Sequence, residues 1–255
     1  MLKRTIPMLL VLLAAFSLKA QKAADTLAKS QIPPPEKLVE LLKQPCSEKN
    51  APLYRALDLG CSPYATVAFT RAHLERGSDN TVITIYDSDS VSLVVLELKN
   101  GAWNHVDTRF LESKYDEPEF SLLSLVEPDT QEIAVSQETL IRGSGVLENH
   151  QVIYKVLNGK LRLVFDERAK ALLKGWETET DFEEQSEFRY EAAKKDEVGT
   201  IFQRATYRNH SQRTVVFRCY AWDEETERFR QMPSKEYSSV EWSKLSRFYS
   251  KKRAR

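Results

Sequence analysis

The feature that most constrains the fold of this chain is a series of short β-prone runs between residues 55 and 235. Runs rich in Val, Ile, Thr, Phe and Tyr alternate with turn residues roughly every ten positions. Such alternation buries one face of an extended segment and indicates strands joined by hairpins. The predicted strands span 65–72, 81–87, 92–98, 102–108, 119–126, 132–137, 150–157, 160–166, 185–192, 199–208, 213–222 and 227–232.

Two Asn-Gly pairs give the clearest local predictions. Asn100-Gly101 and Asn158-Gly159 each stand between two strand-like runs. A two-residue type I′ turn needs positive φ at both central positions, and Asn-Gly meets this need at little steric cost. We therefore expect a tight hairpin at each pair. A third hairpin is predicted around the longer polar loop 223–227.

The runs before the two Asn-Gly pairs resemble each other and lie 58 residues apart, which indicates a weak internal repeat. Several strands per unit fit either propeller blades or a stacked array of sheets, and about three units fall short of the four blades of a closed propeller. The predicted fold is mainly β, an antiparallel hairpin array with a sandwich, barrel or propeller-like arrangement, a short N-terminal helix and a C-terminal helix.

Helical spacing of leucines predicts an entry helix over 36–43, which Pro45 ends. A closing helix is predicted over 236–250, where Ser238 and Glu241 have capping-box spacing. A further helix is predicted over 167–174, capped by Asp166. The predicted organisation is a signal peptide (1–20), a flexible leader ending in prolines (21–35), an entry helix and loop (36–54), a β-rich domain (55–235), the closing helix (236–250) and a basic tail (251–255).

The first residues have the pattern of a secretory signal. Lys3 and Arg4 precede an uncharged apolar stretch of 11 residues, 6–16, and cleavage is predicted near Ala20. The stretch is shorter than the roughly 20 residues that span a bilayer as a helix. The sequence therefore predicts an exported protein, periplasmic or secreted, with no membrane span after processing.

The charge balance argues against nucleic acid as a partner. Of the 37 basic residues, three lie in residues 1–20, which leaves 34 basic against 37 acidic side chains in the predicted mature chain. A nucleic-acid binder usually presents a clustered basic face, and the basic residues cluster only in the tail 251–255. We interpret that tail as a solvated end.

The three cysteines allow one disulfide. Cys46 and Cys61 flank a short proline-containing segment, and an exported protein meets an oxidising compartment, so we expect them to pair. Cys219 shares a face with Val215 and Phe217 in a strand-like run, which indicates a buried and inert thiol.

The sequence contains no strong catalytic or metal-binding motif, and neither a cofactor nor a metal site is predicted. The histidines are isolated: His73, His105, His150 and His210. His105 and Asp107 are two positions apart and would share a face of one strand, as an oriented imidazole would require, but we interpret them as an exposed polar face. Residues 143–145 (Gly-Ser-Gly) are interpreted as a flexible turn.

Acidic residues are frequent in two places. Residues 87–90 alternate carboxylate and hydroxyl oxygens but lack the glycine and later acid of a calcium loop, so we expect a polar turn. The second group is interpreted as a solvated strand face or a guarded edge, with a glycosidase pair as the alternative. It comprises Glu177, Glu179, Asp181, Glu183, Glu184, Glu187 and Glu191.

Aromatic residues offer the remaining candidate for a binding surface. Trp103, Trp176 and Trp222 could hold a glycan or an extended peptide if their rings are exposed together, although most aromatic residues must fill the core. Trp242 is expected on the closing helix.

The hypothesis favoured by the sequence is a non-catalytic binding module for an envelope or extracellular protein or glycan. One alternative is a periplasmic or secreted hydrolase that uses carboxylates from separate strands, and a second is a structural subunit. A concave pocket that gathers two carboxylates, or a histidine and a carboxylate, would favour the hydrolase, whereas a shallow aromatic groove would favour the binding module. The sequence leaves the oligomeric state open.

Overall fold

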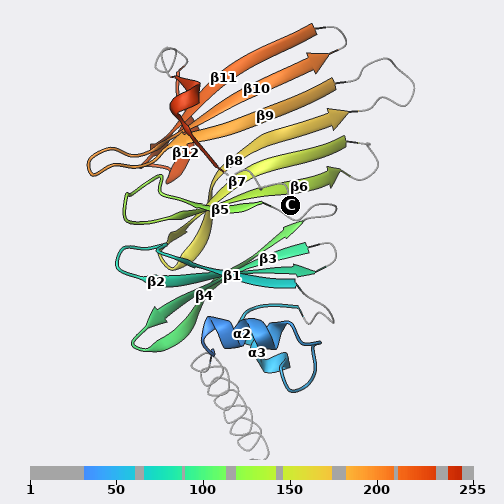
Figure 1. Ribbon diagram of the computed structural model, residues 1–255, viewed down its shortest axis with the longest axis vertical. Helices are drawn as coiled ribbons and strands as arrows, with labels where there is room; N and C mark the ends of the chain where they lie inside the picture. Colours follow the sequence, from blue (N-terminus) through green and yellow to red (C-terminus); the bar gives the residue numbers. More distant parts are fainter. Residues whose placement is uncertain are drawn as a thin grey trace, which may run out of the picture.

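The computed structural model describes residues 32–60, 66–87, 90–112, 119–141, 146–173, 182–209, 212–233 and 241–248. Its strands form two antiparallel sheets in which strands adjacent in sequence are neighbours (Figure 1). The four-stranded sheet contains β1 (Thr66–Ala72), β2 (Asp79–Asp87), β3 (Ser90–Lys99) and β4 (Ala102–Glu112). The larger sheet contains β5 (Phe120–Leu123), β6 (Glu132–Ile141), β7 (Val146–Leu157), β8 (Lys160–Leu173), β9 (Phe182–Glu191), β10 (Thr200–Asn209), β11 (Gln212–Asp223) and β12 (Arg228–Gln231), with β13 (Ser246–Arg247) paired to β9.

The predicted mainly β fold is confirmed, and a strand is present at each of the predicted positions. We group the strands into unit 1 (β1–β4), unit 2 (β5–β8) and unit 3 (β9–β12). Both Asn-Gly turns join the third and fourth strands of a unit and have the positive φ that was expected, 54° at Asn100 and Asn158, 75° at Gly101 and 69° at Gly159. The internal repeat therefore corresponds to successive four-stranded meanders.

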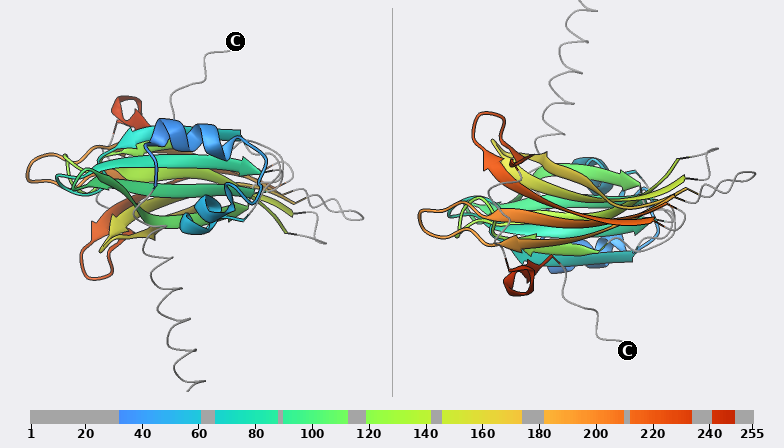
Figure 2. Two further views of the ribbon diagram at one scale, coloured as in Figure 1. Left: turned by 90° about the horizontal axis from the view of Figure 1, so that it is seen from below. Right: turned by 90° about the horizontal axis from the view of Figure 1, so that it is seen from above.

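The units follow one another along the long axis of the molecule in a sandwich-like stack (Figure 1). Seen from below, the helices lie on the outer face of unit 1, and seen from above, the strands of unit 3 lie in front (Figure 2). Hydrophobic clusters fill the space between successive units. One cluster lies between units 1 and 2 and includes Val82, Leu93, Val95, Ile133, Val152 and Leu161. A second includes Ile153, Phe165, Phe188, Ile201, Tyr220 and Phe229 from units 2 and 3.

The hydrogen-bonded sheet is continuous between units 2 and 3 only at one end of β8. β8 pairs with β9 only over Lys170–Leu173, and elsewhere the two strands separate. Phe165 then packs edge-on against Phe188 and Tyr220 of unit 3, with ring centroids 5.9 and 5.1 Å apart. This separation leaves part of the β9 edge open, and β13 occupies it.

The helix predicted over 167–174 is wrong. Residues 160–173 form one strand that pairs with β7 along its length. A register shift between Asn149 and His150 leaves Ala169 as an extra residue in β8. This bulge changes the period-two alternation, which explains why the apolar residues resemble a helical stripe.

The entry helix is confirmed as α2 (Pro35–Leu42), and a second helix that the sequence did not reveal, α3 (Ala51–Ala56), follows it. Their buried residues Leu38, Leu42 and Tyr54 pack against unit 1. The Tyr54 hydroxyl donates to the Leu42 carbonyl at 3.1 Å and so joins the two helices. Within the described residues, no helix combines the length and the apolar character needed to cross a bilayer.

The C-terminal segment differs from the closing helix predicted over 236–250. In its described part, 241–248, Trp242–Lys244 form one turn of 3₁₀ helix (η2), and β13 follows. Leu245 has an extended backbone, with φ −74° and ψ 142°, which ends the helix. Pairing with the open edge of β9 competes with helix formation here, and it leaves Leu245 and Phe248 buried.

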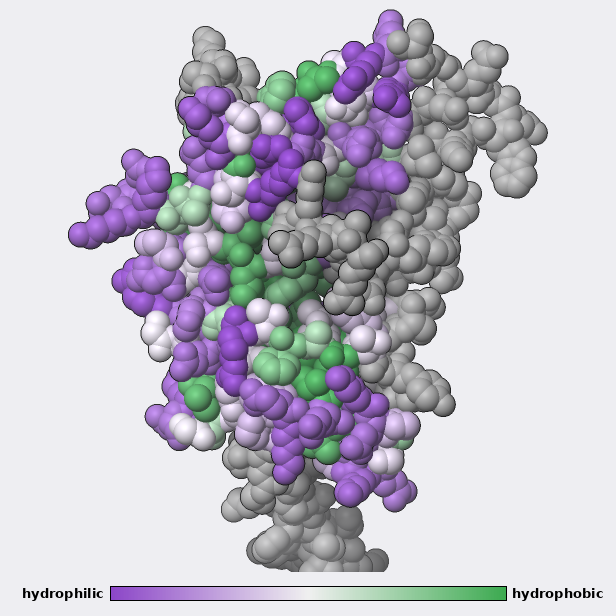
Figure 3. All heavy atoms as spheres, viewed as in Figure 1, coloured by the Kyte–Doolittle hydropathy of each residue, from purple (hydrophilic) through white to green (hydrophobic). Residues whose placement is uncertain are grey.

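On the face shown in Figure 3, charged and polar residues make up most of the surface, and hydrophobic residues gather near its middle, around unit 1 and its contact with unit 2. The two units are also tied by polar contacts. The Asp107 carboxylate accepts from the Leu161 N–H at 2.9 Å, and the Arg109 guanidinium donates to the Leu161 carbonyl at 2.6 Å. Two side chains of β4 thereby hold the main chain of β8.

Candidate functional site

A polar hollow in the described structure lies where β8 crosses to unit 3. It has a volume of about 480 Å³. Strands from both units contribute to its walls, because the sheet is continuous at this point. We call it the junction cleft, and its lining residues are Glu148, His150, Asp166, Glu167, Arg168, Glu184, Tyr207, Arg218 and Gln231.

A chain of ionisable side chains crosses the cleft from β7 and β8 to β9. His150 Nδ1 is 2.8 Å from Asp166 Oδ1, and its Nε2 is 3.4 Å from Glu148 Oε2. Arg168 extends the chain, with its guanidinium 3.2 Å from Glu148 and 2.6 Å from the buried Glu184. The chain exists because i and i+2 residues of a strand share a face, as do residues paired across strands.

A second network continues across unit 3. Arg218 donates to the Tyr207 hydroxyl at 2.7 Å and to the Gln203 side-chain oxygen at 3.0 Å. The same oxygen accepts from the Tyr220 hydroxyl at 2.8 Å. The Gln203 amide donates to the Arg168 carbonyl at 3.3 Å. The two networks therefore form one connected set of polar groups drawn from five strands.

The position of His150 favours its charged form. The hydrogen bond with Asp166 is the main cause that raises the pKa of His150 above its ordinary value of 6.5, and Glu148 acts in the same direction. Burial acts in the opposite direction without cancelling these effects. The cleft thus holds an imidazole whose two nitrogens both face carboxylates.

Two glutamates of the cleft are shifted in opposite directions. Burial raises the pKa of Glu167. Burial also acts to raise the pKa of Glu148, but hydrogen bonds from His150 and Arg168 outweigh it and leave that pKa lowered. Opposite shifts of two carboxyls that line one cleft are a property of acid and base pairs in hydrolases.

Of the three histidines that the structure describes, only His150 lies in this cleft. His73 Nδ1 lies 3.1 Å from the Ser78 carbonyl, and His105 Nε2 lies 2.8 Å from Thr108 Oγ1. An extra residue, Val106, interrupts the alternation between His105 and Asp107, because Val95 pairs with Asp107 and Leu96 with His105. His210 lies outside the described residues.

The acidic residues of β9 separate into different environments. Glu184 is buried in the junction cleft, Glu187 pairs with Arg189 and Arg204, and Glu183 pairs with Arg208. Glu191 is exposed. Glu177, Glu179 and Asp181, the Gly-Ser-Gly turn 143–145 and positions 88–89 lie outside the described residues.

The candidate tryptophans are not gathered on one surface by the described structure. Trp103 is buried among the residues that face α2 and α3, with the Arg71 guanidinium 5.1 Å from its ring centre. Trp222 packs against Phe229 in the cluster between units 2 and 3. Trp176 lies outside the described residues. The guanidinium groups of Arg189 and Arg204 lie 4.9 and 5.0 Å from the ring centre of Trp242.

The cysteines occupy two distinct regions. Cys46 is partly buried beside the helices and is disulfide-bonded. Cys61 lies outside the described residues, so its pairing with Cys46 stays a prediction. Cys219 is buried, and its Sγ lies 3.6 Å from Met232 Sδ. Among the described residues, no group of three or more histidines, cysteines and acidic residues has the arrangement of a metal site.

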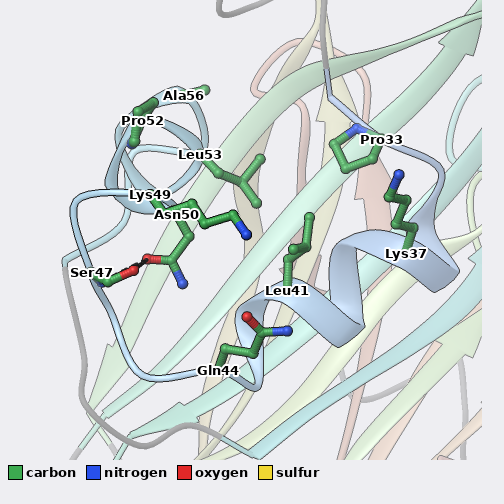
Figure 4. Close-up of a pocket in the computed structure, with 10 residues that line it drawn as sticks. All are labelled: Pro33, Lys37, Leu41, Gln44, Ser47, Lys49, Asn50, Pro52, Leu53 and Ala56. Atoms are coloured by element: carbon green, nitrogen blue, oxygen red, sulfur yellow. Dashed lines mark hydrogen bonds between the residues drawn. The ribbon is translucent and has the colours of Figure 1, made fainter.

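A second hollow, of about 420 Å³, lies between α2 and α3 (Figure 4). Leu41 and Leu53 point toward one another across it from the two helices, and the Lys49 amine extends into the same space. Ser47 and Asn50 are joined by hydrogen bonds at its margin. This hollow is less polar than the junction cleft and lacks acidic residues among its lining.

Comparison with known proteins adds no assignment, since no family model, no curated protein and no solved structure matches the chain. The junction cleft was also missed by sequence reasoning. Glu148 and His150, and Asp166 and Arg168, are i, i+2 pairs within β-prone runs, and this spacing was the available signal. Assigning residues 167–174 to a helix concealed the second pair.

Proposed function

We propose that the chain is a non-catalytic binding module whose ligand-binding surface is the junction cleft. The observation that carries this proposal is the connected chain of Asp166, His150, Glu148, Arg168 and Glu184. Removing the buried Glu184 and the partly exposed groups around it from water costs free energy of desolvation, and a well-packed apolar contact between strands would be about as stable. Polar groups gathered in a hollow are therefore better explained by recognition than by stability alone.

The chemistry of the lining favours a hydroxyl-rich ligand, and we propose a glycan of the cell envelope or extracellular space. Carboxylate, guanidinium, amide and phenol groups supply both donors and acceptors, as sugar hydroxyls require. Four carboxylates face two guanidinium groups and one histidine. This balance disfavours phosphate-rich ligands and suits neutral or amine-bearing sugars.

The proposal can be tested by calorimetric titration with soluble oligosaccharides of neutral, N-acetylated and amino hexoses. Asp166→Asn removes a charge at the cleft while keeping the shape of the side chain, and should weaken binding roughly tenfold. Glu183→Gln is the matched control, because Glu183 is similarly exposed but pairs with Arg208 instead. Equal affinities of the two variants, or binding to none of the sugars, would contradict the proposal. Binding to an envelope protein instead would support recognition but not a glycan ligand.

The opposite pKa shifts of Glu167 and Glu148 favour a second candidate, a hydrolase that acts on a polymer. Glu167, whose pKa is raised by burial, would act as the general acid, and Glu148 would act as a base. The cleft also meets the criterion given for a hydrolase, because it gathers a histidine and several carboxylates. One observation makes this candidate weaker. Glu148 is already engaged by His150 and Arg168.

An assay for new reducing ends separates the two candidates. A hydrolase would release them from polymeric glycans, and Glu167→Gln would abolish the release while binding persists. The binding module predicts no release by either protein.

A further inference from the structure

One terminal strand of the described structure differs from the others in its regular register and its lack of protection. β1 ends the four-stranded sheet and pairs only with β2. Its seven residues pair with β2 in regular register, without a bulge. Five of the seven are exposed, including Phe69, whose exposed fraction is 37%. A long, regular and exposed edge is a template for pairing with another strand.

The other terminal strands are each protected in a recognisable way. β5 and β12 have four residues each, and β12 carries Arg228 and Arg230. β4 contains a bulge and is held to β8 through Asp107 and Arg109. Short length, charge, bulges and covering contacts are the usual means by which proteins prevent edge pairing.

Apart from its contact with α2, β1 lacks these means of protection. It contains neither lysine nor proline, and its single charged residue is Arg71. Arg71 is ion-paired with Glu36 of α2 at 2.8 Å, and its guanidinium lies over Trp103. This charge is therefore directed toward the helix and neutralised there, and it does not guard the edge.

We propose that β1 pairs with β1 of a second copy of this chain, so that two four-stranded sheets join into one. An antiparallel strand pair has two-fold symmetry, so one strand can serve as its own partner, as in most homodimers. A register centred on Phe69 places the two Phe69 rings side by side. It sets Ala68 opposite Thr70 and Val67 opposite Arg71, so that no like charges face each other. This dimer is independent of the junction cleft, which lies in units 2 and 3.

The test is the molar mass of the purified protein, measured by light scattering during size-exclusion chromatography. Loading concentrations up to about 100 µM are used, so that a dimer with a micromolar dissociation constant is populated. The wild-type protein should have twice the monomer mass. Phe69→Lys places two ammonium groups opposite each other and should halve that mass. Thr70→Lys, on the other face of the same strand, should also favour the monomer.

Phe110→Lys is the matched control. Phe110 is the more exposed phenylalanine, at 59%, and it lies on β4, the opposite edge of the same sheet. Its variant should keep the dimer mass, and circular dichroism and thermal unfolding should show that all variants are folded. A monomeric wild-type protein would overturn the proposal. So would a dimer that survives both β1 substitutions, or one that is lost equally in Phe110→Lys.

Discussion

At the scale of single residues, His150 shows how the fold gives a side chain properties that its sequence position does not reveal. In the sequence it is one isolated histidine among four. The pairing of β7 with β8 brings Asp166 to its Nδ1, and alternation along β7 brings Glu148 near its Nε2. Individual strands could be predicted from the sequence, whereas this contact depends on their register and on the bulge at Ala169.

The charge of His150 should make stability depend on pH. Because its folded pKa is raised above 6.5, the protonated imidazole stabilises the fold fully below about pH 6.5, and this contribution is lost as the pH rises through the folded pKa. His150→Gln should therefore lower the free energy of unfolding more at pH 5 than at pH 9, and the difference should be about 1 kcal/mol. Urea unfolding at both pH values measures it. In an Asp166→Asn background the pH difference should shrink, and an unchanged difference would show that Asp166 is not its cause.

A buried ion pair gives a second residue-scale prediction. Lys155 Nζ is 2.9 Å from Glu132 Oε1, and Glu132 Oε2 accepts from the Leu125 N–H at 2.8 Å. Lys155→Met leaves the buried carboxylate without its cation and should cost about 3–5 kcal/mol of unfolding free energy. Adding Glu132→Gln, which keeps an acceptor for Leu125, should recover much of this loss. A double variant no more stable than Lys155→Met would contradict this account.

At the scale of secondary structure elements, strands were predictable because their signals are local. The Asn-Gly turns and the alternating runs specify hairpins without reference to distant residues. The exceptions are informative. α3 is a short helix without a distinctive local signal, and the end of β8 was obscured by its bulge. The C-terminal segment pairs with β9 because β8 leaves that edge open, which no local pattern records.

The connection between β9 and β10 provides a test at this scale. Gly199 donates its N–H to the Leu125 carbonyl at 2.6 Å, and a Cβ added there would lie 2.5 Å from the Glu191 carbonyl oxygen. Gly199→Ala should therefore destabilise the protein by about 1–3 kcal/mol through steric overlap. At Gly60 an added Cβ meets no atom within 4 Å, so Gly60→Ala should change stability by less than about 0.5 kcal/mol. Equal effects in thermal unfolding would contradict the predicted overlap.

At the scale of the whole molecule, the repeat indicated several similar units, but it did not show how they are arranged. The stacking depends on hydrophobic clusters that gather residues distant in sequence, such as Val95 and Val152, and on the hydrogen bonds from β4 to Leu161. The junction cleft is a product of this arrangement, because its walls come from two units. Patterns in a single sequence do not show which distant residues come into contact.

The tie between units 1 and 2 can be tested by hydrogen exchange. Asp107→Ala removes the acceptor of the Leu161 N–H, so exchange of that amide should become roughly ten times faster, as expected for the loss of about 1.4 kcal/mol of local stability. Asp107→Asn retains a side-chain oxygen and should exchange at nearly the wild-type rate. If both variants exchange alike, the contact does not hold the two units together.

Within β1–β4 and within β5–β12, each strand pairs with its neighbour in sequence. This topology affects how the chain folds. Hairpins between consecutive strands close only short loops, so the entropy lost at each step is small. Strand pairing can therefore proceed from one end of the chain during synthesis, before β12 has left the ribosome. β13 is the exception, because it pairs with β9 across unit 3, and it can dock only after that unit has formed.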